Sequence, residues 1–267
     1  MDAPTDTARS AAAHDAHLQY LFRLADNALV LGQRLAEWCG HGPVLEEELA
    51  LTNISLDLIG QARLLLAHAG ELEGQGRDED ALAFLRDEPD FRNWTLMELP
   101  NGSGPHEDYA VTIARNFLAG CLQLPLWEAL AQSSDPQLAA IAARAVKEAR
   151  AHLRHATGWM IRLGDGTEVS RARMQSALDR LWPYTHEFWA EDAIDQTVIA
   201  HGIGSSTSAL RPAWEAQVDA VLARATLRRP PDSRFLSSGR QGRHSEHLGY
   251  LLAEMQSLAR AHPGARW

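Results

Sequence analysis

The segment from Gly70 to Asp108 decides how the rest of the chain can be arranged. It reads GELEGQGRDEDALAFLRDEPDFRNWTLMELPNGSGPHED, with several glycines, three prolines and one short helical pattern from Asp78 to Arg86. A segment of this length is too long for a simple turn inside a compact domain. The sequence therefore predicts either a functional loop or a crossover between two halves of the fold.

Helical patterns lie on both sides of this segment, and no stretch alternates with the period of a β-strand. Two long helices are predicted before it and several after it, over Leu18–Trp38, Val44–Ala69, Asp108–Ala131, Pro136–Leu163, from near Ser170, and over Pro212–Ala225 and Glu246–Ala261. Short turns join the first two helices, and also the third, fourth and fifth. One long crossover inside a four-helix bundle is the ferritin-like arrangement. The predicted fold is all-α, a ferritin-like four-helix bundle with one long crossover and additional C-terminal helices.

The predicted helix Val44–Ala69 has apolar residues on two faces. One stripe contains Leu45, Leu49, Leu56, Ile59 and Leu66, and a second contains Leu51, Ile54, Leu58 and Leu65. A helix that is apolar on more than one face is typically buried on more than one face. We therefore expect this helix to be central and mostly buried.

Composition bounds the class of protein. The chain has 267 residues, a formal net charge of −10, 45% hydrophobic residues and two cysteines. We expect a disordered tail over residues 1–16 and a single helical domain over residues 17–267. Net acidity disfavours nucleic acid as a partner, because neutralising phosphates dominates that affinity. No window has the roughly 18 uncharged apolar residues of a membrane span, and two scattered cysteines are typical of a reduced, cytoplasmic protein.

Helices two and four carry the candidate metal ligands. Ferritin-like di-metal sites take a carboxylate from each of two helices and a Glu-x-x-His motif from each of the other two. The second helix offers Asp57, and the fourth offers Glu148, His152 and His155 along one face. These four side chains either bind a metal or form a hydrogen-bonded polar cluster in an apolar seam. Because the chain lacks a complete Glu-x-x-His motif, the polar cluster is favoured.

A segment rich in arginine, proline, serine and glycine precedes the last helix. Its arginines are Arg228, Arg229, Arg234, Arg240 and Arg243. Such a segment is either a solvated linker or a contact for an anion or a partner, since arginine suits both.

Several sequence runs identify a family. In order they are LADNALVLGQRLAEWCGH (24–41), DLIGQAR (57–63), PNG (100–102), KEARAHLR (147–154), EHLG (246–249), LAEMQ (252–256) and a C-terminal Trp267. From about Leu18 onward the chain closely resembles the family of structural, ferritin-like C subunits of the ring 1,2-phenylacetyl-CoA epoxidases of aerobic bacterial phenylacetate degradation. The extra N-terminal residues are the main departure from that family.

The resemblance implies which positions once held metal. In this family a catalytic di-iron A subunit pairs with a ferritin-like C subunit, alongside a B subunit and a reductase with a flavin and an iron–sulfur cluster. The ligand positions of the A subunit fall here on Asp57 and Gly60, on Ala149 and His152, near Ala119, and near Gln33 on the first helix. Asp57, Gly60, Ala149 and His152 are thus implied to be vestigial metal-site positions, with Glu148 and His155 in a polar seam. No catalytic residue, metal ligand or cofactor is expected in this chain.

The resemblance also implies a function. The chain would be a non-catalytic partner that keeps the di-iron A subunit intact while phenylacetyl-CoA, dioxygen and reductant give the ring 1,2-epoxide. Its partners would be A, B and the reductase, and self-association is left open. The alternative is a ferritin-like metal oxygenase in its own right, using Asp57, Glu148, His152 and His155. A third idea is that the Arg228–Arg243 segment binds coenzyme A phosphates across a subunit boundary.

Overall fold

The computed structural model describes residues 6–102 and 108–265, and these residues form helices and no β-strand. Three short 3-10 helices are η1 (Glu88–Asp90), η2 (Trp182–Trp189) and η3 (Gly239–Gln241). The α-helices are α1 (Asp6–Ala36), α2 (Leu45–Glu73), α3 (Glu79–Phe84), α4 (Thr95–Glu98), α5 (Tyr109–Leu130), α6 (Pro136–Gly164), α7 (Glu168–Leu181), α8 (Ala193–Ala200), α9 (Thr207–Arg224) and α10 (Glu246–Ala261). The prediction of an all-α fold is confirmed.

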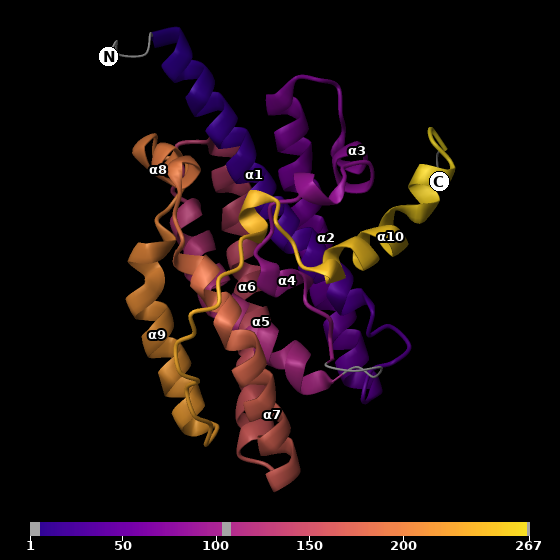
Figure 1. Ribbon diagram of the computed structural model, residues 1–267, viewed down its shortest axis with the longest axis vertical. Helices are drawn as coiled ribbons and strands as arrows, with labels where there is room; N and C mark the ends of the chain where they lie inside the picture. Colours follow the sequence, from indigo (N-terminus) through magenta and orange to yellow (C-terminus); the bar gives the residue numbers. More distant parts are fainter. Residues whose placement is uncertain (1–5, 103–107, 266–267) are drawn as a thin grey trace.

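The four long helices α1, α2, α5 and α6 make the ferritin-like bundle (Figure 1). α1 packs along α2, α5 packs along α6, and α2 contacts α6. A short turn closes each antiparallel pair, and the segment between Glu73 and Tyr109 crosses from one pair to the other. The prediction that Gly70–Asp108 is a crossover is therefore confirmed. α7 and α9 pack on α5 and α6, while α10 lies at the side of the bundle against α3 and α4.

The first helix starts earlier than the sequence pattern predicts. Residues 6–16 form the first turns of α1, so the prediction of a disordered tail is wrong for them, while residues 1–5 lie outside the described residues. Alanine has the highest helix propensity, and the run Ala11–Ala13 extends the helix. Ala16 is buried against the bundle. His17 is hydrogen-bonded to Asp135, the residue directly before α6. These contacts anchor the first turns of α1.

The second helix is buried on one face only. Leu51, Leu58 and Leu65 are buried, as expected. In the other predicted stripe Leu66 is buried and Ile59 is half-buried, but the exposed fractions of Leu45, Leu49 and Leu56 are 68%, 55% and 61%. The prediction of a central, mostly buried helix is therefore wrong, because no element among the described residues covers this face. By length and composition α2 could cross a membrane, but core helices meet the same criterion, and α2 packs along α1.

The C-terminal half contains one helix that the sequence pattern does not predict. This helix is α8, and Asp192 caps its N-terminus by accepting hydrogen bonds from the Ile194 and Asp195 backbone N–H groups. The helix predicted to begin at Pro212 begins instead at Thr207, because the side chain of Ser206 caps it. Helix α10 has the predicted bounds.

Buried charges on α1 hold the crossover in place. Asp26 is fully buried and forms an ion pair with both terminal nitrogens of Arg86, from the end of the α3 region, and Arg86 also lies over the ring of Phe91 at 4.4 Å. Asp26 also accepts a hydrogen bond of 2.8 Å from the backbone N–H of Arg92. One carboxylate of the bundle thereby fixes two points of the crossover.

A second buried pair joins the crossover to the C-terminal segment. Glu98 and His244 have no exposed side-chain surface, and His244 Nδ1 lies 2.8 Å from Glu98 Oε2. The other ring nitrogen, Nε2, lies 3.0 Å from the carbonyl oxygen of Phe91. Both partners are acceptors, so both ring nitrogens donate and the ring is an imidazolium. Burial lowers the pKa of His244, but the bonds and charge of Glu98 outweigh burial and raise the pKa above its usual value.

We expect Asp26→Asn to lower the free energy of unfolding by about 3–5 kcal/mol, because it leaves the Arg86 guanidinium buried without its counter-charge. Urea denaturation measures this loss. The matched control is Glu215→Gln, which breaks partly exposed pairs with Arg211 and Arg229 and should cost no more than about 1 kcal/mol. Equal losses in the two variants would contradict the role given to Asp26.

We expect the contribution of His244 to stability to fall as the pH rises. Its pKa is higher in the folded chain than the unfolded value near 6.5, so the contribution is complete below about pH 6.5 and is lost as the pH passes the folded pKa. In His244→Gln this charge is absent at every pH. The difference in unfolding free energy between the wild type and His244→Gln should therefore narrow from pH 6 to pH 9, and a difference that grows would be contrary to it.

Candidate functional site

The residues predicted as metal ligands lie along the contact between α2 and α6. We call this contact the α2–α6 seam. Three polar pairs cross it, each with a separation of 2.8 to 2.9 Å: Glu47 with His155, Asp57 with His152, and Gln61 with Glu148. The four candidate ligands are thus divided among three separate pairs. Among the described residues, no group of three converging ligand atoms includes any of them. The geometry favours the polar-cluster interpretation over the metal oxygenase.

The Asp57–His152 pair lies at the outer edge of the seam. The Asp57 side chain is 43% exposed, whereas the His152 side chain is 14% exposed. Burial lowers the pKa of His152 more than the hydrogen bond and charge of Asp57 raise it. The ring is therefore neutral at pH 7, and its Nε2–H donates to a carboxylate oxygen of Asp57. The Asp57–His152 contact is therefore an ordinary hydrogen bond near the protein surface.

Glu47 is a seam residue that the sequence pattern does not single out. It accepts hydrogen bonds from Tyr109 and from His155. Burial raises the pKa of Glu47, but these bonds outweigh burial and hold the pKa below its usual value. Its only sequence signal was its place among three acids in the first turn of α2, which also suits a solvated helix start.

The vestigial positions implied by the resemblance do not all face the bundle interior. Ala119 and Ala149 are buried, while Gln33 is half-buried. A Cβ on Gly60 would have no heavy atom within 4 Å, so a side chain there would project into open space. Asp57 is 43% exposed, so these two implied metal-site positions lie on a side of α2 that faces outward.

The donor set does not fit a di-iron centre. A ferritin-like site takes a ligand from each of the four bundle helices, but the only carboxylate on α5 is Glu128, which is exposed and paired with Arg150. Every buried carboxylate among the described residues already has a protein partner: Asp26 with Arg86, Glu98 with His244, Asp135 with His17 and His68, Glu187 with the Thr95 N–H, and Asp195 with Arg23 and Arg240. No set of buried acids is left to bind two irons.

The sequence pattern does not reveal one cluster of side chains that could bind a metal. His17, His68 and Asp135 come from three elements, and their Nε2 and carboxylate oxygen atoms all lie within 4.8 Å of one another. Asp135 is separated from them by 118 and 67 positions in the chain, so no local motif could reveal the cluster. Asp135 was visible only as part of a helix start.

The arginine-rich segment is only in part a free linker, and it is not one basic patch. Arg240 is buried and bonded to Asp195, and Arg229 pairs with Glu215 and Asp219. The Gly239 N–H donates to Thr95 on α4, so the segment is tied to the bundle. Arg228, Arg234 and Arg243 are exposed, and within the described residues no ion pair engages them. Buried polar contacts of Gly239 and Arg240 tie the end of the segment to the bundle, whereas residues 231–236 are exposed, as in a solvated linker.

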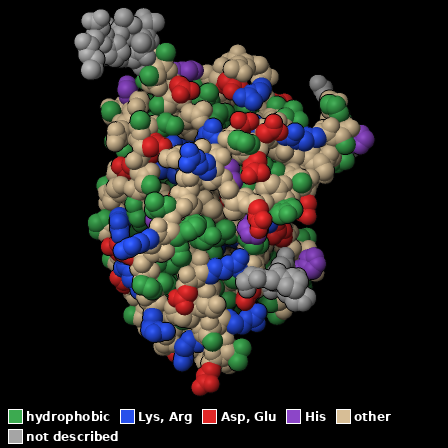
Figure 2. Space-filling view, in the orientation of Figure 1, with side chains coloured by type: hydrophobic (Ala, Val, Ile, Leu, Met, Phe, Trp, Pro, Cys, Tyr) green, Lys and Arg blue, Asp and Glu red, His purple; other side chains and the backbone are tan. Residues whose placement is uncertain are grey.

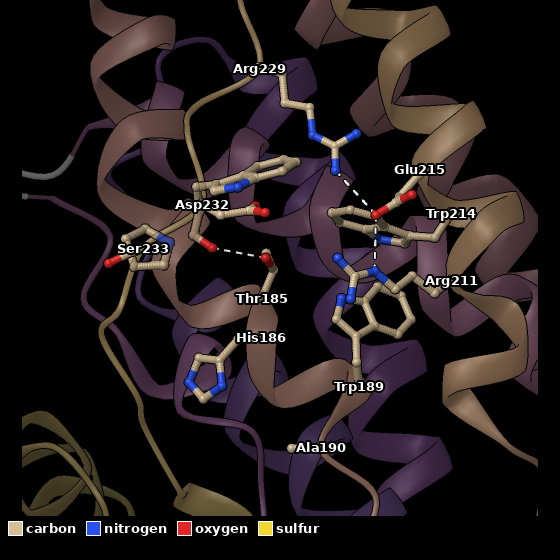
Figure 3. A pocket seen from close by; sticks show the side chains of 12 residues that line it. Thr185, His186, Trp189, Ala190, Arg211, Trp214, Glu215, Arg229, Asp232 and Ser233 are labelled. Atoms are coloured by element: carbon tan, nitrogen blue, oxygen red, sulfur yellow. Dashed lines mark hydrogen bonds and ion pairs between the residues drawn. The ribbon is translucent and has the colours of Figure 1, made fainter.

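An aromatic pocket lies beside this segment, between η2 and α9 (Figure 3). Its volume is about 300 Å³, and Trp182, Trp189 and Trp214 form much of its lining. Arg211 and Arg229 both contact Glu215 Oε1, at 2.9 and 3.2 Å. Because Glu215 and Asp232, which also lines the pocket, together balance the charges of the two arginines, the pocket offers little net attraction to a phosphate. It does not favour the idea of a coenzyme A phosphate site.

Side chains in the sequence runs that carry the resemblance form hydrogen bonds with backbone groups of other segments. Asn27 accepts a hydrogen bond of 2.7 Å from the Trp94 N–H, and Arg34 donates to the carbonyl oxygens of Glu98 and His247. Asn101 donates to the Arg34 carbonyl oxygen at 2.7 Å. These residues connect α1 to the crossover and to α10, so the contacts they make are structural ones.

We expect the Asp57–His152 pair to contribute little to stability, because Asp57 is largely solvated. A double-mutant cycle with Asp57→Ala and His152→Ala should give a coupling energy of at most about 1 kcal/mol by urea denaturation. The metal content of the purified chain should not change in His152→Ala. Loss of a bound metal in that variant would support the oxygenase alternative instead.

Comparisons with known proteins show the family of this chain. The model of the family described as phenylacetic acid catabolic protein matches residues 1–267. The chain is also 51% identical, over 248 residues, to the C subunit of the 1,2-phenylacetyl-CoA epoxidase of Escherichia coli strain K12. That alignment covers 93% of this chain and 98% of the relative. The chain belongs to the phenylacetic acid catabolic protein family.

Proposed function

We propose that this chain is the structural C subunit of a 1,2-phenylacetyl-CoA epoxidase complex and has no active site of its own. The observation that supports this most is the combination of 51% identity to an epoxidase C subunit with a donor set that does not fit two irons. Catalysis then belongs to a partner, a di-iron A subunit. A B subunit and a reductase with a flavin and an iron–sulfur cluster complete the complex, in the cytoplasm.

The reaction served by the complex consumes phenylacetyl-CoA, dioxygen and two reducing equivalents. One oxygen atom enters the ring as the 1,2-epoxide, and the other leaves as water. The di-iron centre of the partner supplies the oxygen chemistry. In this proposal the residues of the present chain hold a rigid surface against that partner and contact no reacting atom.

Exposed apolar side chains support a role as part of a larger assembly. Leu45, Leu49 and Leu56 follow the uncovered face of α2 at helical spacing, and Val44 directly precedes the helix; each of the four is more than half exposed. We call these four residues the α2 apolar stripe. Contiguous exposed apolar surface marks interaction sites in soluble proteins, and obligate interfaces between chains are the most hydrophobic ones. Figure 2 also shows hydrophobic side chains grouped near the middle of the visible face, bordered by charged ones.

Co-expression with the A subunit tests the proposal. We expect the two chains to co-purify, the A subunit to hold the iron, and the present chain alone to hold no stoichiometric pair of irons and no oxygenase activity. We also expect A to be poorly soluble without this chain. Two tightly bound irons in this chain alone, or an active and well-behaved A subunit without it, would refute the proposal.

Variants of the α2 apolar stripe sharpen this experiment. Leu49→Glu combined with Leu56→Glu should weaken co-purification by about tenfold or more, because interface truncations at buried anchors cost more than about 1 kcal/mol each. Val169→Glu is the matched control, since Val169 is 68% exposed but lies on α7. If both variants bind A like the wild type, the stripe is not the interface, while the iron measurement still tests the structural role.

A further inference from the structure

Three side chains from distant parts of the chain meet at one end of the bundle. His17 lies on α1, His68 lies on α2, and Asp135 is the residue that caps α6. The Nε2 atoms of His17 and His68 lie 2.8 and 2.6 Å from the same carboxylate oxygen, Oδ2 of Asp135. The two imidazole rings meet edge to face, with centroids 5.8 Å apart. Three donor atoms therefore converge on one point.

The second oxygen of Asp135 has a separate structural task. Oδ1 accepts hydrogen bonds from the backbone N–H groups of Gln137 and Leu138 at 2.9 and 3.2 Å, which caps α6. This division leaves Oδ2 directed at the two histidines. The carboxylate is thus held in orientation by the helix it caps, independently of the histidines, which is how ligand side chains are preorganised in metal sites.

The protonation states also suit metal binding. Burial raises the pKa of Asp135, but the bonds from His68, Leu138 and His17 outweigh it, so the pKa is below its usual value and the group is ionised. Burial lowers the pKa of His17 more than Asp135 raises it, so this ring is neutral at pH 7. Ligands must be deprotonated before a metal binds, so the Asp135 carboxylate is ready to bind, and each Nε2 binds after its proton has moved to Nδ1 or to water.

The other histidine–carboxylate contacts lack this convergence. The pairs Asp57–His152, Glu47–His155 and Glu98–His244 contain one histidine each. Among the described residues, three converging ligand atoms occur only at His17, His68 and Asp135. A single histidine with a carboxylate is an ordinary hydrogen bond, whereas two histidines on one carboxylate oxygen form a three-donor set.

We infer that His17, His68 and Asp135 form a binding site for one divalent transition-metal ion, Zn²⁺ by preference, that ties the ends of α1, α2 and α6 together. Two imidazole nitrogens and one carboxylate oxygen are a donor set that zinc takes in proteins, with water in the fourth position. The side chains of His17, His68 and Asp135 are 14%, 11% and 7% exposed. The site lies outside the bundle centre, so it does not replace the di-iron site.

Zinc titration of the full chain without a polyhistidine tag tests the inference. We expect one zinc per chain by calorimetry and elemental analysis, and a rise in melting temperature with zinc. Bound Co²⁺ should give the visible absorption of a low-coordinate nitrogen and oxygen site. Asp135→Asn is the decisive variant, because asparagine caps a helix as well as aspartate does but is a poor metal ligand.

In Asp135→Asn and in His68→Gln we expect zinc affinity to fall by about tenfold or more, the loss that even outer-shell changes cause. His152→Gln is the matched control and should bind zinc like the wild type. The melting temperature of Asp135→Asn without zinc should stay near that of the wild type, which shows that the cap survives. No stoichiometric zinc in the wild type, or equal zinc affinity in Asp135→Asn, would overturn the inference. Iron counts on the same samples test the proposed function separately.

Discussion

The rest of the structure depends on the need to pair the charges that α1 carries into the interior. Arg23, Asp26 and Arg34 are all buried on a helix whose other face packs on α2. An unpaired buried charge costs several kcal/mol, so each of them needs a partner from another segment. Asp26 takes Arg86 from the crossover, Arg34 takes carbonyl oxygens of the crossover and of α10, and Arg23 takes carboxylates beside α8. Segments with little regular structure are thereby fixed against the bundle.

Close packing of small residues adds to these buried charge pairs in stabilising the four-helix bundle. In the interior, small residues allow close approach: a Cβ on Gly120 would lie 3.4 Å from Leu153, and Ala119 and Ala149 are buried. The side chains predicted as metal ligands lie away from this interior, along the α2–α6 seam. An interior of this kind suits a chain whose contribution is a stable outer surface. The uncovered apolar stripe on α2 is the part of that surface that most needs a partner, because burying it removes apolar area from water.

Much of the fold could be predicted because helices and turns are local. The bounds of α10 and the crossover between Gly70 and Asp108 follow from periodicity, glycine and proline alone. Errors arose where long-range contacts override local pattern. Two apolar stripes on α2 indicated burial on both faces, but burial depends on whether another element arrives there. The arginine-rich segment resembles a solvated linker and is exposed over residues 231–236, yet Arg240 is buried because Asp195 meets it from a distant helix.

Taken by itself, the sequence determined the all-α class, the four long helices, the crossover, and the absence of a complete Glu-x-x-His motif. Only the tertiary structure decided which polar side chains meet. It separated Asp57, Glu148, His152 and His155 into different pairs, turned Gly60 outward, and brought His17, His68 and Asp135 to one point. The physical reason is the distance along the chain over which each kind of interaction acts. Helix formation depends on neighbours three or four residues apart, whereas a ligand set depends on how whole helices pack, and a rotation of one helix by one residue moves a side chain from the interior to the surface.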